Sequence, residues 1–294
     1  MNIELLHSTI LNDFPSGSAI EFYDGVLYLI GDDASKILLL NAAYKTIDAI
    51  TIFETDEYRI PKKKKTDLEA STIIEYNQKM YLIVLGSASK GKREKMLLLS
   101  LDEADANKFE ILETDTFIEN LEHAGIEEVN IEGAATIGNK ILLSNRGNKT
   151  HPNNFLIQTD ANFFTHQNKA ELNICELKIN KDESMMAGIS GLCYADYNDT
   201  LFFSASTEFT DNAIDDGKIG DSYLGIINNI STRLGEKIIT PDAMLNLSKM
   251  NKAFDGEKIE SVCIEQHDNN GIILHLVSDN DLGKTGLFKI KLIV

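Results

Sequence analysis

The sequence predicts an all-β fold, and three observations carry this prediction. Short apolar runs of strand length alternate with polar turns along almost all of the 294 residues. Most runs are bounded by Gly, Asn, Asp or Ser, which supply the geometry of turns. Helical periodicity is confined to 116–123 and 243–250, each only about two turns long.

A short phrase that recurs before a strand divides the chain into repeats. The residues that open the phrase are Ser18, Glu69, Glu132, Ser190 and Glu260. The third repeat contains four predicted strands within 132–179, and the five repeats, of 51 to 70 residues, tile the chain. Four-stranded units arranged radially make a β-propeller. The sequence therefore predicts one domain, 1–294, folded as a five-bladed β-propeller.

The last repeat tests this prediction, because only three strands follow Glu260. The fourth strand must then come from 2–11, which closes the ring with the N-terminal strand and opposes unzipping. Six blades are the second choice, and a sandwich or a two-domain all-β protein is the remaining one. A sixth blade needs another phrase in the longest interval, where we interpret 231–257 as one outer strand and a long connection.

Composition excludes several classes of partner. The chain has 28 Lys and Arg against 46 Asp and Glu, a net charge of −18 that repels nucleic acid. No apolar run approaches the roughly 18 to 20 residues of a membrane span. The start of the chain lacks the pattern of a signal peptide, and no CxxC pair occurs among its three cysteines. We expect a cytoplasmic monomer that binds neither nucleic acid nor membrane.

The five repeated positions form a candidate metal site. The first strand of each blade lines the propeller axis, so Ser18, Glu69, Glu132, Ser190 and Glu260 should converge near one mouth. Each pair of ionised glutamates about 5 Å apart costs about 3 kcal/mol at an effective dielectric constant of about 20. Shared protons or a cation would relieve this repulsion, and carboxylate and hydroxyl oxygens suit Ca²⁺. The alternative is a water-filled channel lined by polar side chains.

This series resembles the calcium-activated nucleotidases, the apyrase family, and related phytase-like propellers. Two stretches of the sequence are also similar to that family: 18–28 followed by Asp32-Asp33, and 190–193 leading into 201–203. The resemblance implies a five-bladed propeller, a central Ca²⁺ held by the five repeated residues, and hydrolysis of nucleoside diphosphates. It does not place the phosphate-handling residues of that family in this chain.

The loops between the second and third strands should open at the same mouth. Blades 2 and 3 present a basic arc there, to which 62–65 should add, and the other blades present an acidic one. A basic arc beside a cation favours an anionic ligand, although polar loops are also ordinary solvated surface. The candidate ligand-binding residues are Lys92, Arg93, Asn145, Lys149, His151, Glu208 and Asp279.

Two functions fit these features. One is a metal-dependent hydrolase of a small anionic or phosphorylated substrate, in which Ca²⁺ polarises an oxygen. Arg146 with Lys149 would hold negative charge, and Asp32 or Asp33 would orient water. The other is a non-catalytic propeller that binds a ligand or a protein and in which the ion only fixes the blades. The residues do not decide between an enzyme and a binding module.

Overall fold

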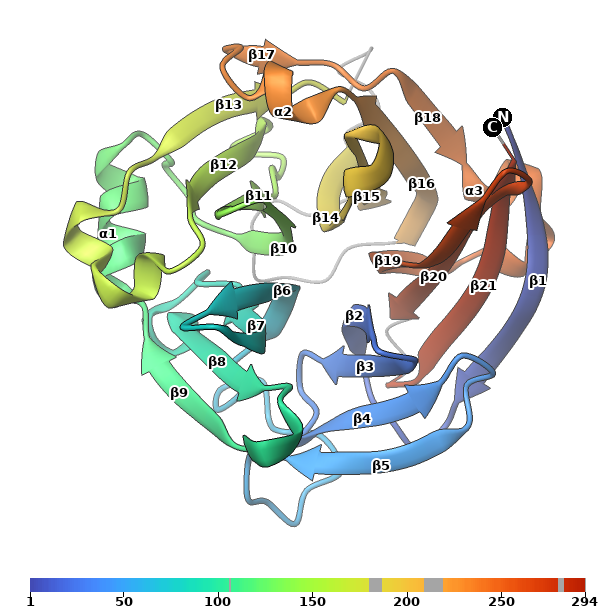
Figure 1. The fold of residues 1–294 in the computed structure, drawn as a ribbon, viewed down its shortest axis with the longest axis horizontal. Coiled ribbons are helices and arrows are strands. Elements are labelled where there is room, and N and C mark those ends of the chain that lie inside the picture. The colour runs from blue at the N-terminus through green and yellow to red at the C-terminus, as the bar shows by residue number, and fades with distance from the viewer. Residues whose placement is uncertain (106, 180–186, 209–218, 280–282, 294) are drawn as a thin grey trace.

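The strands form a ring of five blades around a central axis (Figure 1). The structure, a computed structural model, describes residues 1–105, 107–179, 187–208, 219–279 and 283–293. Within these ranges four sheets have four strands and one has five. The predicted five-bladed β-propeller is confirmed, and the six-bladed alternative is wrong.

The blades follow one another along the chain, each running from the axis outward. Blade 1 consists of β2 (Gly17–Tyr23), β3 (Val26–Gly31), β4 (Lys36–Asn41) and β5 (Thr46–Thr51). Blade 2 consists of β6 (Leu68–Tyr76), β7 (Lys79–Gly86), β8 (Lys95–Ser100) and β9 (Phe109–Glu113). Blade 3 consists of β10 (Ile131–Ile137), β11 (Lys140–Asn145), β12 (Asn154–Asp160), β13 (Asn173–Leu177) and β17 (Ile238–Ile239).

Blade 4 consists of β14 (Ala187–Ala195), β15 (Thr200–Glu208), β16 (Ile219–Asn228) and β18 (Ala243–Asn246). Blade 5 consists of β19 (Lys258–Asp268), β20 (Gly271–Asp279), β21 (Thr285–Ile293) and β1 (Asn2–Leu11). The α-helices of the described chain are α1 (Asp115–His123), α2 (Ile230–Arg233) and α3 (Leu247–Met250), all in connections between strands.

The N-terminal strand closes the ring, as predicted. β1 pairs antiparallel with β21, from Asn2 opposite Ile293 to Leu11 opposite Thr285. Figure 1 shows the two ends of the chain side by side at this seam, the blue β1 outside the red β21. The outermost strand of blade 5 thus comes from the opposite end of the sequence.

The core is divided among the interfaces between neighbouring blades. Alternate residues of one strand serve different interfaces: Leu82 and Val84 of β7 pack toward blade 1, whereas Ile83 packs toward blade 3. A sheet buried on both faces needs apolar residues at successive positions. This requirement explains why the sequence shows continuous apolar runs rather than an alternating pattern.

The two predicted helices have different outcomes. The stretch 116–123 is helical in α1, whereas 243–250 begins as strand β18 and turns helical only at Leu247. Pairing of β18 with β16 takes the first half of this stretch, because tertiary contacts override a weak helical period. The connection before it adds β17 in parallel to β13, so it bridges the outer edges of two blades.

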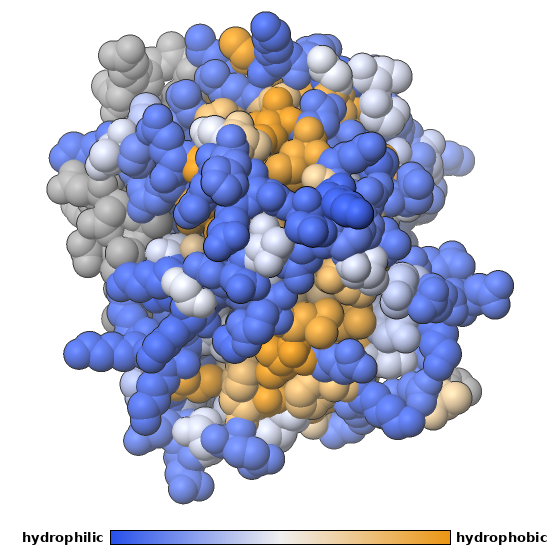
Figure 2. Space-filling view, turned by 90° about the vertical axis from the view of Figure 1, so that its left-hand side faces the viewer, coloured by the Kyte–Doolittle hydropathy of each residue, from blue (hydrophilic) through white to orange (hydrophobic). Residues whose placement is uncertain are grey.

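Polar side chains cover most of the flank formed by blades 2 and 3 (Figure 2). Apolar side chains show between them, and Ile111 on β9 is 39% exposed. No helix in the described part of the chain has the length and apolar character needed to cross a membrane.

Candidate functional site

The five repeated positions are equivalent in the structure. Each lies at a bulge of its inner strand, at the end of the axis that we call the axial mouth. The register shifts fall between Gly17 and Ala19, Leu68 and Ala70, Ile131 and Gly133, Ile189 and Leu192, and Ile259 and Ser261. A bulge leaves one residue out of the ladder and redirects its side chain. The sequence repeat therefore marks a real structural position, and its role in metal binding stays a prediction.

The two serines of this set tie neighbouring blades together. Ser18 Oγ donates a hydrogen bond to the carbonyl of Leu68 (2.5 Å), and Ser190 Oγ donates to the carbonyl of Ile259 (2.9 Å). Both serines are buried. In each case the accepting residue precedes a repeated glutamate of the next blade. The observed contacts of the serines are therefore bonds between blades.

Arg146 lies between two of the glutamates. Its Nη1 is 3.7 Å from Glu132 Oε2 and 4.0 Å from Glu260 Oε2. The other oxygens of these carboxylates are held by Asn130 Nδ2 (2.7 Å) and Lys258 Nζ (2.9 Å). Arg146 was predicted to hold an anion, and this role stays a prediction. Its side chain is 7% exposed, and it also lines a pocket together with Asn145 and His151. Two like-charged glutamates attract the guanidinium inward more strongly than solvent does.

Two further sets of residues surround the repeated positions: the residues two places before them, and the residues that follow the second strand of a blade. Residues two places before each repeated position are Ser16, Asp67, Asn130, Gly188 and Lys258. In three blades the residue after the second strand donates its backbone N–H to this set, as Asp32 does to Ser16 (3.1 Å) and Ser87 does to Asp67 (2.9 Å). Our sequence analysis did not single out Asp67 or Lys258, although their constant two-residue offset was a usable signal.

Local backbone geometry places Asp32, Asp33 and Asp67. A Cβ atom on Gly31 would lie 2.4 Å from the carbonyl oxygen of Pro15, so only glycine fits beneath the turn that carries the two aspartates. Asp67 has φ +59°, in the left-handed region that Asp tolerates better than most residues. These two features bring loops from blades 1 and 2 together.

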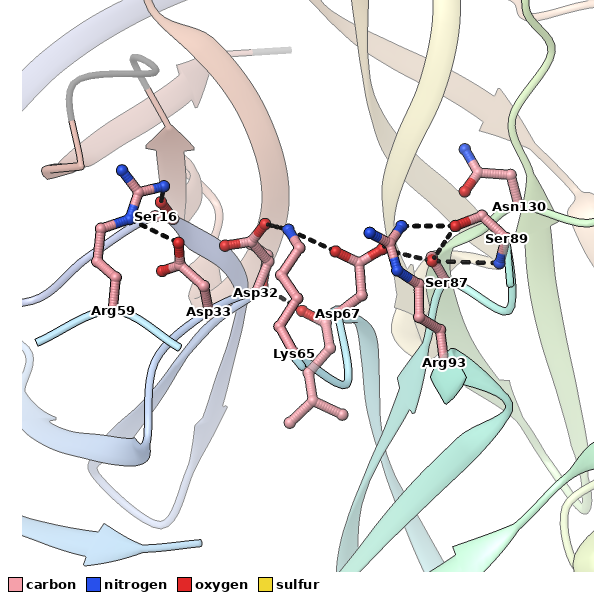
Figure 3. A network of polar contacts seen from close by, with 12 residues as sticks. Ser16, Asp32, Asp33, Arg59, Lys65, Asp67, Ser87, Ser89, Arg93 and Asn130 are labelled. Carbon is pink, nitrogen blue, oxygen red and sulfur yellow. Dashed lines mark hydrogen bonds and ion pairs between the residues drawn. The ribbon is translucent and has the colours of Figure 1, made fainter. Parts of the chain in front are cut away.

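Three carboxylates meet at this point and form what we call the acidic cluster, Asp32, Asp67 and Glu69. Each offers one oxygen, and the three oxygens lie within 4.8 Å of one another. Lys65 Nζ forms ion pairs with Asp32 and with Asp67 Oδ1 (2.6 Å), as Figure 3 shows. Arg93 Nη1 lies 2.5 Å from Asp67 Oδ2. Oxygens at this spacing are able to share a metal ion.

Two buried carboxylate oxygens at the cluster lack a donor within the described chain. Asp33 accepts a hydrogen bond from Arg59 Nε (2.6 Å) through Oδ2, and its side chain is 5% exposed. Its Oδ1 and the Oδ1 of Asp32 are buried and have no hydrogen-bond partner among the described residues. Unsatisfied buried acceptors are costly, and such atoms are typical of places that bind water, an ion or a ligand.

The charges at the mouth do not balance. Carboxylates outnumber cations: Asp32, Asp33, Asp67, Glu69, Glu132 and Glu260 against Arg59, Lys65, Arg93, Arg146 and Lys258. Within the described chain, Glu69 makes no hydrogen bond or ion pair of its own. Burial, and then the charges of Asp67, Glu132 and Asp32, raise the pKa of Glu69 well above its ordinary value.

Two neighbouring carboxyls are also shifted. Burial raises the pKa of Asp32 to about 6, against the lowering effect of Lys65. Burial likewise raises the pKa of Glu132 to about 7, against the lowering effect of Arg146. Carboxyls with pKa values near neutrality in one cleft are typical of functional sites, although structural ion-pair networks also shift pKa values.

A pocket of about 310 Å³ opens beside the acidic cluster. It is lined by Asp32, Asp33, Arg59, Ile60, Pro61, Lys62, Lys65 and Asp279. The expectation that the basic run 62–65 reaches this rim is met by its first and last lysines. Asp279, the last residue of β20, was predicted to bind ligand and lies here. Its role stays a prediction.

The other predicted ligand-binding residues do not gather in that pocket. Arg93 is 5% exposed and engaged by Asp67, whereas Lys92 and Lys149 are exposed. Asn145 is buried and accepts the N–H of Asn130 (2.7 Å), so it organises its own loop.

His151 also lies away from the pocket. His151 lines a separate pocket of about 300 Å³, with Nδ1 2.8 Å from Glu127 Oε2. Glu208 is the last residue of β15, and the loop that follows it, 209–218, lies outside the described residues, as does 280–282.

Fold and site together define the class of this chain: a five-bladed β-propeller with an ionic cluster at the axial mouth. The chain belongs to a family described as a family of unknown function (DUF6929), which it matches over residues 13–292. The family found is not that of the calcium-activated nucleotidases. That resemblance is therefore confirmed at the level of the five-bladed fold and not for the activity.

A glutaminyl cyclase of known structure shows the same fold at low sequence identity. The glutaminyl cyclase of Myxococcus xanthus has a TM-score of 0.56 and 10% identity, over 99% of this chain and 97% of that one. The arabinanase of Bacillus subtilis has a TM-score of 0.49 and 12% identity, over 96% of this chain and 95% of that one. A comparison with curated proteins gave no match. Identities this low show the fold alone.

Proposed function

We propose that the axial mouth binds a divalent cation of the calcium type and hydrolyses a small anionic, phosphorylated substrate beside it. The observation that carries the proposal is the spacing of the acidic cluster, three carboxylate oxygens within 4.8 Å. Hard oxygen ligands suit Ca²⁺ better than zinc or copper. Of the five predicted ligands, the proposed site retains Glu69, and it adds Asp32 and Asp67. The proposal places the protein in the cytoplasm as a monomer.

The excess of negative charge supports a cation at this point. Glu69 has no cationic partner of its own in the described chain, and the pKa of Glu69 is raised by burial and by neighbouring carboxylates. A cation would relieve that repulsion. It would also supply a partner for the buried oxygen of Asp32 that lacks one.

The adjoining pocket supports an anionic substrate. Arg59 is 45% exposed in its side chain and lines the pocket together with Lys62. A bound Ca²⁺ would supply Lewis acidity to a phosphoryl oxygen. Glu132 has a pKa of about 7 and is suited to accept or donate a proton at neutral pH.

Calcium titration by calorimetry, with thermal melts in Ca²⁺ and in EDTA, tests the cation. We expect stoichiometric binding and a higher Tm in Ca²⁺ for the wild type. Glu69→Gln should weaken binding by about tenfold or more, since one charged ligand is lost. Glu75→Gln is the matched control, because Glu75 is exposed farther along the same strand. Absence of both heat and a Tm shift in the wild type would overturn the proposal.

Turnover is tested with nucleotides, phosphomonoesters and, because a similar solved structure is a glutaminyl cyclase, glutaminyl peptides. We expect phosphate release that needs Ca²⁺ and is lost in Glu132→Gln while calcium binding is kept. Calcium binding without turnover on any substrate would reject the hydrolase.

That outcome would leave the second candidate, a non-catalytic binding propeller. It is favoured by the way in which the ion pairs join blades. Arg146 of blade 3 contacts Ser206 of blade 4 (3.1 Å) and Glu260 of blade 5 (4.0 Å). In this reading the charges fix the blades, and a ligand or protein binds at the mouth without being changed.

A further inference from the structure

The pocket of about 310 Å³ beside the acidic cluster has a lining in which opposite charges are paired. Three carboxylates and three cations line it: Asp32, Asp33, Asp279, Arg59, Lys62 and Lys65. Asp33 pairs with Arg59 (2.6 Å) and Asp32 pairs with Lys65, as Figure 3 shows. Glu69, where the mouth carries its excess of negative charge, does not belong to this lining. Charge alone therefore does not determine which groups of a ligand lie against this wall.

The two neighbouring aspartates of the wall lack hydrogen-bond donors. The Oδ1 atoms of Asp32 and Asp33 are buried and have no partner among the described residues. The side chain of Asp33 is 5% exposed and that of Asp32 is 17% exposed. An ionised carboxylate only accepts hydrogen bonds, and a buried acceptor without a donor costs free energy. A ligand at this wall must therefore bring donors, which a fully ionised phosphate or carboxylate group lacks.

Hydroxyl groups bring such donors without adding a charge. A hydroxyl donates through its hydrogen and accepts through its oxygen, so it can bind a carboxylate and a cation together. Arg59 stands beside Asp33 with 45% of its side chain exposed, in position to donate to a hydroxyl oxygen. An ammonium group would instead add a fourth cation to a lining that is balanced without it.

The remaining wall of the pocket is apolar and fixed to the aspartates. Ile60 and Pro61 complete the lining and offer apolar surface to C–H groups. The N–H of Ile60 donates to the carbonyl of Asp33 (2.8 Å), which holds this wall against the turn that carries both aspartates. The volume lies at the lower end of the range of about 300 to 1,000 Å³ that is typical of small-molecule sites. It suits one sugar ring rather than a chain of several.

We propose that this pocket binds a neutral polyhydroxylated group, such as a single sugar ring, through Asp32 and Asp33. Vicinal hydroxyls donate to the two Oδ1 atoms, Arg59 donates to a hydroxyl oxygen, and the carbon skeleton packs on Ile60 and Pro61. The inference goes beyond the proposed function, because this contact needs neither a bound cation nor turnover.

The probes are D-glucose, D-galactose, D-mannose and D-ribose, which differ in the arrangement of their vicinal hydroxyls. Saturation-transfer NMR detects binding in EDTA at pH 8, above the pKa of about 6 of Asp32, so that this carboxylate is ionised. We expect the wild type to bind at least one of the four sugars. A deoxy form that lacks a donating hydroxyl should bind about ten- to hundredfold more weakly, the effect of losing one hydrogen bond to a charged group.

Asp33→Asn tests whether the sugar lies in this pocket. It replaces one acceptor oxygen by an amide nitrogen, and we expect it to weaken sugar binding by about tenfold or more. Asp56→Asn is the matched control, because Asp56 is exposed in the connection between β5 and β6 that also carries Arg59, and it should bind as the wild type does. Sugar binding that Asp33→Asn leaves unchanged overturns the inference.

Methylammonium and sulfate serve as charged probes under the same conditions. Failure of the wild type to bind any of the four sugars overturns the inference, and binding of methylammonium or sulfate in their place assigns the pocket to a charged ligand. This result needs no variant, so it does not depend on the folding of Asp33→Asn. Calcium is absent throughout, so such a failure leaves the proposed cation site to its own titration. Sugar binding by a protein that binds no calcium overturns the cation site alone.

Discussion

Two buried ionic clusters of the described chain can be compared, one at the axial mouth and one at the seam where β1 closes the ring. At the seam, His275 is fully buried, with Nδ1 2.8 Å from the Tyr44 hydroxyl and Nε2 2.8 Å from Glu265 Oε2. Lys289 Nζ lies 2.5 Å from the same oxygen. At the mouth, Glu69 has no such partner in the described chain, and Asp32 and Asp33 each keep a buried oxygen without a donor.

The difference shows that buried charge alone does not mark a binding site. The cluster at the seam is complete. Each of its polar groups contacts a partner in blade 5 or blade 1, so none of the groups named needs a ligand. The mouth is incomplete, and that lack is what motivates a cation there. Substitutions should therefore act with opposite signs in the two clusters.

The largest expected effect is at the seam. Glu265→Gln removes the charge that Lys289 and His275 share, and it leaves a partly buried ammonium group without its partner. We expect a loss of about 3 kcal/mol in the free energy of unfolding, measured by urea denaturation. A loss below about 0.5 kcal/mol would contradict the view that the seam depends on this cluster.

An effect of about 3 kcal/mol is expected from pH at the mouth, because each unit of pKa shift is worth about 1.4 kcal/mol. The folded chain holds the proton of Glu132 up to a pKa of about 7, whereas the unfolded chain releases it near 4.5. The stability from this group is present below pH 4.5 and is lost as the pH rises through 7. Glu132→Gln should therefore gain stability relative to the wild type between pH 4.5 and 8, in EDTA.

The seam should show the reverse dependence on pH. Burial lowers the pKa of His275 to about 4, so its contribution is present above about 6.5 and is lost as the pH falls toward 4. Glu265, Lys289 and the Tyr44 hydroxyl face this ring. Urea denaturation as a function of pH separates the two clusters, and a difference between Glu132→Gln and the wild type that does not change with pH would refute the assignment at the mouth.

The smallest effect is at Glu69, and like the effect of Glu132→Gln it has the opposite sign to the effect at the seam. Glu69→Gln makes the same chemical change as Glu265→Gln but removes an uncompensated charge. We expect it to stabilise the protein by about 1 kcal/mol at pH 8 in EDTA, because the pKa of Glu69 is raised in the folded state. Urea denaturation beside Glu75→Gln measures this, and a destabilised Glu69→Gln would show that the mouth is as complete as the seam.

The sequence predicted the features of the fold that repeat from blade to blade. The five equivalent bulges follow from one phrase, and the strand 2–11 follows from counting strands after Glu260. These features depend on local order and on the need to pair every strand, both of which the sequence shows directly.

Contacts between loops of different blades could not be predicted in this way. The pairing of Lys65 with Asp32 and Asp67 joins a connecting segment to a turn of blade 1, and no spacing in the sequence fixes that distance. The inward position of Arg146 likewise depends on the field of two glutamates that are 128 residues apart in the chain. The balance of charges depends on contacts between residues far apart in the chain, so no local sequence pattern shows it.

The order of synthesis affects how the seam between β1 and β21 forms. On the ribosome β1 is made first and its partner β21 last, so the nascent chain carries an unpaired strand until translation of this region ends. Two chains in that condition can each supply the strand that the other lacks. Crowded polysomes would thus favour strand-exchanged dimers, and a chaperone that covers the first ten residues would suppress them.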